Sequence, residues 1–185
     1  TCNLYPELTR SHRIHVVPLY VLWGDRSYRD GVDLGERELF QRLAAEREIP
    51  KTSQATPQDF VAAFEQARAA EGADAVVCGV LSSALSGTYA SAIQAREMVN
   101  FPVHVIDTRK VSWALGFTML AAAQARDAGK SPEEIAQAIA ETASRTHILF
   151  TIESLDYIHR GGRISNASRL LGTALNIKPL LEIRD

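Results

Sequence analysis

The sequence has few cysteines, no long apolar run and no excess of one charge. Its 185 residues include only Cys2 and Cys78, too few for a disulfide framework, which favours a reducing compartment such as the cytoplasm. No apolar run approaches the roughly 20 residues that a membrane-spanning helix needs. The 20 basic and 22 acidic residues leave a net charge of −2, so no overall positive field attracts nucleic acid. We therefore expect a cytoplasmic protein with no transmembrane segment and no nucleic-acid partner.

The first residues, Thr1-Cys2-Asn3-Leu4, include no initiator Met and no basic or apolar segment of a secretion signal. We expect no such signal, and we expect that a few residues precede Thr1. With 46% hydrophobic and 23% charged residues, the composition is that of a soluble globular protein. The length suits one ordinary domain, or one domain and part of another.

Short apolar runs alternate with segments of helical periodicity along the chain. This alternation predicts an α/β fold in which helices cover both faces of a parallel, Rossmann-like sheet. The run 179–183 begins a strand that no later segment can pair with, so we expect the chain to end inside a second domain. The predicted strands are 14–23, 74–81, 103–106, 147–152 and 179–183, and the predicted helices are 34–47, 57–72, 89–99, 112–128, one from 132, 155–159 and 167–176.

Two polar loops are candidates for a binding site. The first is Thr52-Ser53-Gln54, and the second, 82–88, follows the predicted strand 74–81 and contains Ser86, Gly87 and Thr88. Ligands of open α/β sheets bind at the carboxyl ends of strands, and a loop that leads into a helix offers backbone N–H groups to an anion. The hydroxyls of Ser86 and Thr88 would add donors. The alternative is that both loops only cap helices.

Signatures of common enzymes are absent from the sequence. Neither loop contains the Lys of a Walker motif, no Gly-x-Ser-x-Gly surrounds Ser86, and the histidines lack zinc-ligand spacing. Asp107 ends a predicted strand and could be catalytic or could cap a turn. The basic loop Arg160-Gly161-Gly162-Arg163 is either a solvated turn or a contact for an anion or a partner, and Arg163 is the residue that we expect to face a ligand's anionic head.

These loops and several further motifs resemble the DegV family of bacterial fatty-acid-binding proteins, and the match runs nearly end to end. The two most specific motifs are Lys51-Thr52-Ser53-Gln54 and Ser82-Ser83-Ala84-Leu85-Ser86-Gly87-Thr88-Tyr89. The others are Thr1 to Leu8, Val16-Val17-Pro18-Leu19, Asp107-Thr108 with Ser112-Trp113-Ala114-Leu115-Gly116, Leu155 to Ile164, and Leu171-Gly172 with Ile177-Lys178-Pro179.

The resemblance implies a two-domain α/β fold. Residues 1–145 would form the N-terminal domain without its first strand, and residues 146–185 would begin the C-terminal domain. A long-chain fatty acid such as palmitate would lie between the domains, with its carboxylate bound by the hydroxyls of Thr52 and Ser86. No metal, cofactor or nucleophile would be needed.

The resemblance also implies a role in lipid metabolism. Several members carry the acyl chain for a fatty acid kinase, which phosphorylates the bound carboxylate, whereas others have no known activity. The resemblance therefore leaves open whether this protein has a kinase partner. The alternative from a different class is an α/β enzyme that acts on a small phosphorylated or carboxylated substrate through Ser86 or Asp107. That enzyme would need a base near Ser86, and no sequence motif supplies one.

Overall fold

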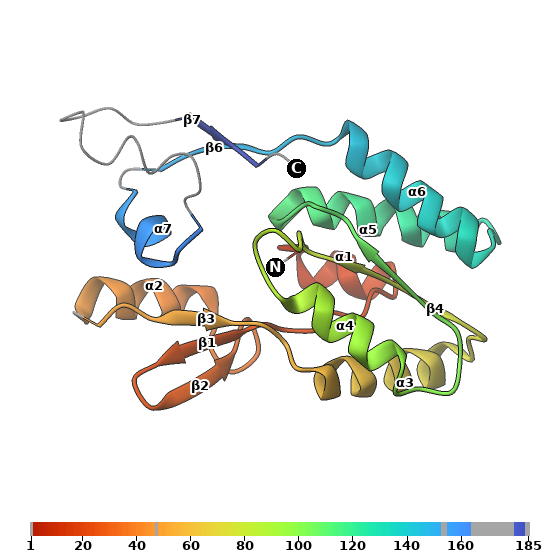
Figure 1. Cartoon of the computed structure of the whole chain (residues 1–185), viewed down its shortest axis with the longest axis horizontal. Helices are drawn as coiled ribbons and strands as arrows, with labels where there is room; N and C mark the ends of the chain where they lie inside the picture. The colour runs from red at the N-terminus through yellow and green to blue at the C-terminus, as the bar shows by residue number, and fades with distance from the viewer. Residues whose placement is uncertain (1, 47, 153–154, 164–179, 184–185) are drawn as a thin grey trace. The chain divides into compact units, whose positions relative to one another are not determined.

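The computed structural model describes residues 2–46, 48–152, 155–163 and 180–183 (Figure 1). The chain separates into two units, Thr1–Thr146 and His147–Asp185. The assignment of residues 1–145 and 146–185 to two domains of the protein stays a prediction. The expected helix 167–176 lies outside the described residues.

The first unit has an α/β architecture with a parallel pair of strands, β4 and β5, and a separate antiparallel sheet of order β2-β1-β3. This confirms the predicted fold class. Its helices are α1 (Pro6–Ser11), α2 (Glu36–Ala45), α3 (Pro57–Glu71), α4 (Thr88–Arg96), α5 (Ser112–Asp127) and α6 (Pro132–Arg145), and its strands are β1 (Tyr20–Trp23), β2 (Arg26–Arg29), β3 (Lys51–Ser53), β4 (Val76–Val80) and β5 (Val103–Asp107).

The second unit contains a short antiparallel pair. Strands β6 (Leu149–Thr151) and β7 (Leu180–Glu182) pair with each other, and α7 (Asp156–Arg160) lies between them in the sequence. The strand predicted at 179–183 therefore forms, and its partner is an earlier segment, which the sequence analysis did not foresee. The strands are antiparallel, and their paired residues lie 29 to 33 positions apart along the chain. A pairing over that distance leaves no local sequence signal.

Helices pack against both faces of the β4–β5 pair, as predicted (Figure 1). Phe60 and Phe64 of α3 are buried in one cluster with Val80 of β4. Ile139 of α6 is fully buried in another cluster, against which Val77 of β4 packs. Successive residues of one strand point to opposite faces, so each face of the pair has its own helical cover.

Two predicted helix starts are confirmed. The hydroxyl of Thr56 accepts the N–H of Asp59 at the start of α3, and the Asp59 carboxylate accepts the N–H of Thr56. Ser131 and Glu134 form the same reciprocal pair at the start of α6. In both helices a proline follows the capping residue, where its missing N–H costs no hydrogen bond.

Two sequence predictions about strands need correction. The run 14–23 forms a strand only at Tyr20–Trp23, and residues 14–19 have no strand partner among the described residues. Lys51–Ser53, which we expected to be a loop, is strand β3 and pairs with β1. Helix α1 and strand β2 were not expected at all. Strand formation depends on a neighbouring chain, and the sequence of the segment alone does not identify that neighbour.

An apolar trough of about 460 Å³ runs along β4 in the first unit. Its lining includes residues 13–17 and the residues from Asp74 to Leu81. Its walls also include side chains of α3 and α5: Phe60, Phe64, Leu115 and Met119. Leu81 and Thr88 belong to the lining near the carboxyl end of β4.

Main-chain groups of alternate β4 residues point into this trough. The N–H of Val76 and the carbonyl of Val80 bond to the chain of β5 and its flanks, at 3.0 and 3.1 Å. Because the main-chain groups of successive strand residues alternate sides, those of Val77 and Gly79 face the trough, where no described residue pairs with them. A hydrocarbon tail could not satisfy these groups, whereas a further strand could. The expected strand before Thr1 stays a prediction.

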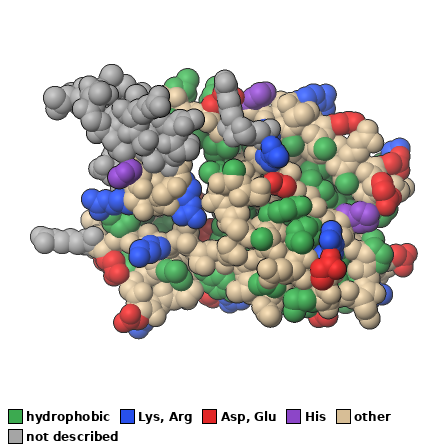
Figure 2. All heavy atoms as spheres, viewed as in Figure 1, with side chains coloured by type: hydrophobic (Ala, Val, Ile, Leu, Met, Phe, Trp, Pro, Cys, Tyr) green, Lys and Arg blue, Asp and Glu red, His purple; other side chains and the backbone are tan. Residues whose placement is uncertain are grey.

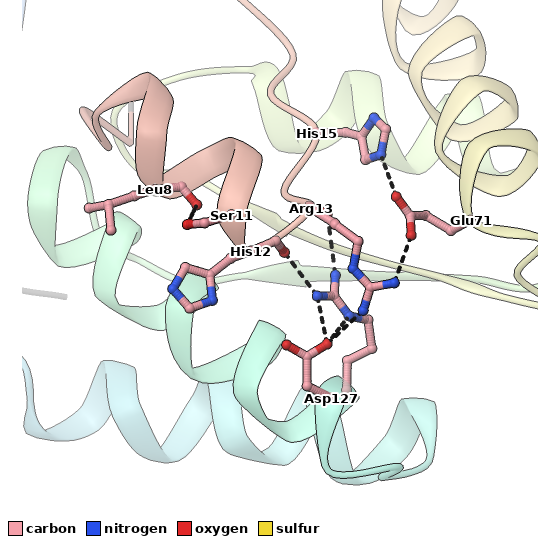
Figure 3. Close-up of polar contacts among 8 residues, drawn as sticks. Leu8, Ser11, His12, Arg13, His15, Glu71 and Asp127 are labelled. Atoms are coloured by element: carbon pink, nitrogen blue, oxygen red, sulfur yellow. Dashed lines mark hydrogen bonds and ion pairs between the residues drawn. The ribbon is translucent and has the colours of Figure 1, made fainter.

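A cluster of ion pairs contributes Arg13, His15 and Glu71 to the lining of the trough (Figure 3). The Arg13 guanidinium contacts the carboxylates of Glu71 at 3.0 Å and Asp127 at 2.9 Å, and Nε2 of His15 lies 3.7 Å from Glu71. The side chains come from a loop, from α3 and from α5. The cluster therefore ties three segments together, and His15 has a carboxylate neighbour there.

Hydrogen exchange of the 185-residue chain tests the unpaired edge of β4. We expect the amides of Val77 and Gly79 to exchange faster than those of Val76, Cys78 and Val80, because only the latter face β5. Amide exchange followed by NMR resolves these neighbours individually, and the paired residues serve as the internal control. Equal protection of all five amides would contradict an open edge.

Candidate functional site

The loop 82–88 forms a tight turn at the carboxyl end of β4. The N–H groups of Leu85 and Ser86 donate to the carbonyl of Ser82 at 3.1 and 3.2 Å. The N–H of Ser82 donates to the carbonyl of Lys110, just after β5, at 3.0 Å. The loop is thus attached to the ends of both parallel strands, the usual position of a ligand site in this class of fold.

Two hydroxyls lie together at the start of α4. The Oγ of Ser86 is 2.7 Å from the Oγ1 of Thr88 and accepts the N–H of Thr88 at 3.3 Å. Ser86 is half-buried and Thr88 is buried. One hydrogen bond between two hydroxyls uses one of their two protons, so the second can be donated to a ligand. Gly87 and not Ser86 is the N-cap of α4, and no side chain caps this helix, so the capping interpretation does not hold for Ser86.

The two predicted loops are in contact through Gln54. Its Nε2 donates to the Oγ of Ser91 in α4 at 2.9 Å. Its amide also lies so close over Gly87 that a Cβ at that position would collide with it. Gln54 directly follows β3, so this contact brings the end of β3 next to the loop that contains Ser86.

Thr52 and Ser53 lie in β3, opposite Val21 and Tyr20 of β1. Thr52 is exposed and Ser53 is half-buried. Five of the six predicted site residues are therefore in the first unit, on the two segments that Gln54 joins. Their roles in binding stay predictions.

The sixth, Arg163, belongs to the second unit, where its Nη1 donates to the carbonyl of Gly161 within the same short loop. Gly162 has a φ of +72°, a left-handed conformation that glycine adopts at little cost and that makes this sharp turn possible. That Arg163 faces a ligand stays a prediction.

The geometry does not supply an enzyme's catalytic groups among the described residues. The Oδ1 of Asp107 accepts the N–H groups of Ser83 at 3.2 Å and Arg109 at 3.0 Å, so this carboxylate caps a turn. Ser86 has no histidine or carboxylate partner in the described part of the chain. Burial raises the pKa of the Cys78 thiol to about 12, so this thiol is protonated at neutral pH.

The described residues also show no group of three potential metal ligands, and no helix among them is long and apolar enough to cross a membrane. On the face shown in Figure 2, acidic and basic side chains are interspersed. That face therefore has no broad patch of one charge.

Sequence reasoning missed two residues near this site. Gln54 was noted only as part of a motif, and its contact with Gly87 depends on two segments that are 33 positions apart. Lys110 lies beside Ser82 and is buried, although lysines usually occupy the surface. No sequence pattern distinguishes it.

The chain matches a known family over its whole length. The model of the family described as "Uncharacterised protein, DegV family" matches residues 1–185. A DegV domain-containing protein of Deinococcus radiodurans is 41% identical over 184 residues, which are 100% of this chain and 65% of that protein. The chain thus spans about two thirds of the length of this relative.

Solved structures show the same fold. A Thermus thermophilus DegV family protein, described by its fatty acid binding, is 34% identical and gives a TM-score of 0.89, with 100% of this chain and 65% of that chain covered. The Bacillus subtilis protein DegV, described as a fatty acid binding protein, is 31% identical and gives a TM-score of 0.87. The match covers 100% of this chain and 66% of that chain.

The resemblance noted in the sequence is confirmed by these matches, together with the parallel strand pair and its helical cover. The protein belongs to the DegV family.

Proposed function

We propose that the protein binds a long-chain fatty acid by its carboxylate at the end of β4, with the hydroxyls of Thr52 and Ser86 as the main donors. Ser53, Gly87 and Thr88 complete the two segments around the head group. The fatty acid binding of the Thermus and Bacillus relatives supports this ligand class. A carboxylate suits the site because the hydroxyls can donate hydrogen bonds to it and the positive amino end of α4 attracts its negative charge.

The contact of Gln54 with Gly87 and Ser91 carries this proposal. It joins the segment of Thr52, which lies in β3, to the loop of Ser86 between β4 and α4. The Gln54 contact is the observation that places the two hydroxyls on connected segments, which is why we assign them to one ligand. Hydrogen bonds to a charged group stabilise a complex by about 1.5–3 kcal/mol each, so two donors are enough to orient the head group.

The hydrocarbon tail supplies most of the affinity in this proposal. At ~0.8 kcal/mol per buried methylene, about a dozen methylenes contribute roughly 10 kcal/mol. We do not place the tail in the trough beside β4, because the trough presents the unpaired main-chain groups of Val77 and Gly79. Arg163 would attract the anionic head.

The role that we propose is that of a carrier and not of an enzyme. The described residues offer hydroxyl donors without a catalytic base, and these bind a carboxylate without transforming it. A fatty acid kinase that phosphorylates the bound carboxylate is the proposed partner, and the cytoplasm is the proposed location.

Replacing both hydroxyls tests the head-group site. In the full-length natural protein, Thr52→Val with Ser86→Ala should weaken hexadecanoic acid binding by at least roughly 100-fold, because two bonds to a charge are lost. Isothermal titration measures the change. The control is Thr9→Val with Ser11→Ala, since these hydroxyls bond only to carbonyls of α1 and its first turn. Unchanged affinity in the Thr52–Ser86 variant would refute the assignment.

A single methyl group tests the contact between the segments. Gly87→Ala should displace the Gln54 amide, break its bond to Ser91 and lower the stability by about 1 kcal/mol, with weaker fatty acid binding as well. Gly35→Ala is the matched control. Both glycines precede a helix with negative φ, and nothing lies within 4 Å of a Cβ at Gly35. If the two variants lose equal stability and affinity, the contact has no special role.

A further inference from the structure

Tyr20, at the start of β1, is connected to a second element through its hydroxyl. The phenolic O–H donates to the Oδ1 of Asp59, in the first turn of α3, at 2.9 Å. This hydrogen bond raises the pKa of Tyr20, so the hydroxyl stays protonated at neutral pH and acts as the donor to the carboxylate. The bond therefore links β1 directly to the start of α3.

The Asp59 carboxylate divides its two oxygens between two partners. The Oδ2 accepts the N–H and the hydroxyl of Thr56 at 2.8 and 2.7 Å, which completes the reciprocal cap of α3. The Oδ1 accepts the hydroxyl of Tyr20. Because the cap is complete without Oδ1, the start of the helix does not depend on Tyr20. The bond to Tyr20 is therefore additional to helix capping, and it fixes where α3 begins relative to β1.

Tyr20 is thereby attached to both ends of the segment that runs from Ser53 to Thr56. Its main chain lies opposite Ser53 in the antiparallel pairing of β1 with β3, and its side chain reaches Thr56 through Asp59. The segment and Tyr20 thus close a ring of contacts. A short segment with both ends fixed has far fewer conformations than one that is fixed at a single end.

Gln54 and Ala55 lie inside this ring. Ala55 is fully buried, and the Gln54 amide donates to the Oγ of Ser91 and lies over Gly87. The ring favours this conformation of Gln54 before any ligand is present, because few alternatives remain. A group that is already in its bound conformation does not lose that conformational freedom on binding, and the affinity is correspondingly higher.

We infer that Tyr20 is a positioning residue for the proposed head-group site. Its hydroxyl acts through Asp59 on the closed segment, and the segment keeps Gln54 in contact with α4. The connection between Thr52 and the loop of Ser86 then persists in the ligand-free protein. The inference rests on the proposed function and adds to it a residue that need not touch the ligand.

The Tyr20 hydroxyl can be removed with little change of shape. In the full-length natural protein, Tyr20→Phe should weaken hexadecanoic acid binding roughly fivefold, the effect of one hydrogen bond of ordinary strength, as measured by isothermal titration. Tyr28→Phe is the matched control. It removes the same group from β2 of the same sheet, where Arg42 and Arg26 lower the pKa of that hydroxyl. We expect its affinity to stay within about twofold of wild type.

A double-mutant cycle with Gln54→Leu separates positioning from general stabilisation. If Tyr20 acts through Gln54, Tyr20→Phe should change the affinity by less than about twofold once Gln54 is replaced. A merely structural Tyr20 would weaken binding by the same factor in both backgrounds. The ligand-free protein gives a second readout by NMR. The side-chain N–H signals of Gln54 should shift towards those of an exposed glutamine in Tyr20→Phe but not in Tyr28→Phe.

The outcomes separate this inference from the proposed function. If wild type does not bind hexadecanoic acid, the proposed function fails. If Thr52→Val with Ser86→Ala weakens binding but Tyr20→Phe binds as tightly as wild type, only the role of Tyr20 is wrong. Equal weakening in both Gln54 backgrounds, or unchanged Gln54 signals, would make Tyr20 a structural residue and overturn the inference.

Discussion

The parallel pairing of β4 with β5 is the interaction on which the candidate site depends. It brings the ends of two strands side by side, so that the 82–88 loop and the turn after β5 are linked by main-chain hydrogen bonds. The hydroxyl of Thr108 strengthens the link through the Val80 carbonyl. Buried helices on both faces hold the pair. A loop anchored in this way keeps Ser86 and the start of α4 in one position.

The site also needs a contribution from a second sheet. Thr52 lies in β3 of the antiparallel sheet, and Gln54 carries that segment to α4. Gly87 allows the close approach because it has no side chain. This contact therefore joins the segment that contains Thr52 to the loop that contains Ser86, and each of the two hydroxyls can be removed by a substitution of its own.

The sequence was sufficient to predict the α/β class, the helix starts at Thr56 and Ser131, and the position of the polar loop after β4, because periodicity and capping are local properties. It was insufficient where a second chain segment decides the outcome. Residues 14–19 have the composition of a strand but no strand partner within the described parts of the chain, whereas the polar Lys51–Ser53 becomes a strand because β1 lies beside it. The contact between Gln54 and Gly87 and the burial of Lys110 are likewise products of the tertiary fold.

Native mass spectrometry of the full-length natural protein, purified from cells without added lipid, tests the central claim most directly. Binding energies of the size proposed for the tail and head group would retain the ligand through purification. We predict an additional mass equal to that of a C16–C18 fatty acid, released as the free acid on denaturation. A protein that is empty, and that stays empty after incubation with hexadecanoic acid, would contradict the account.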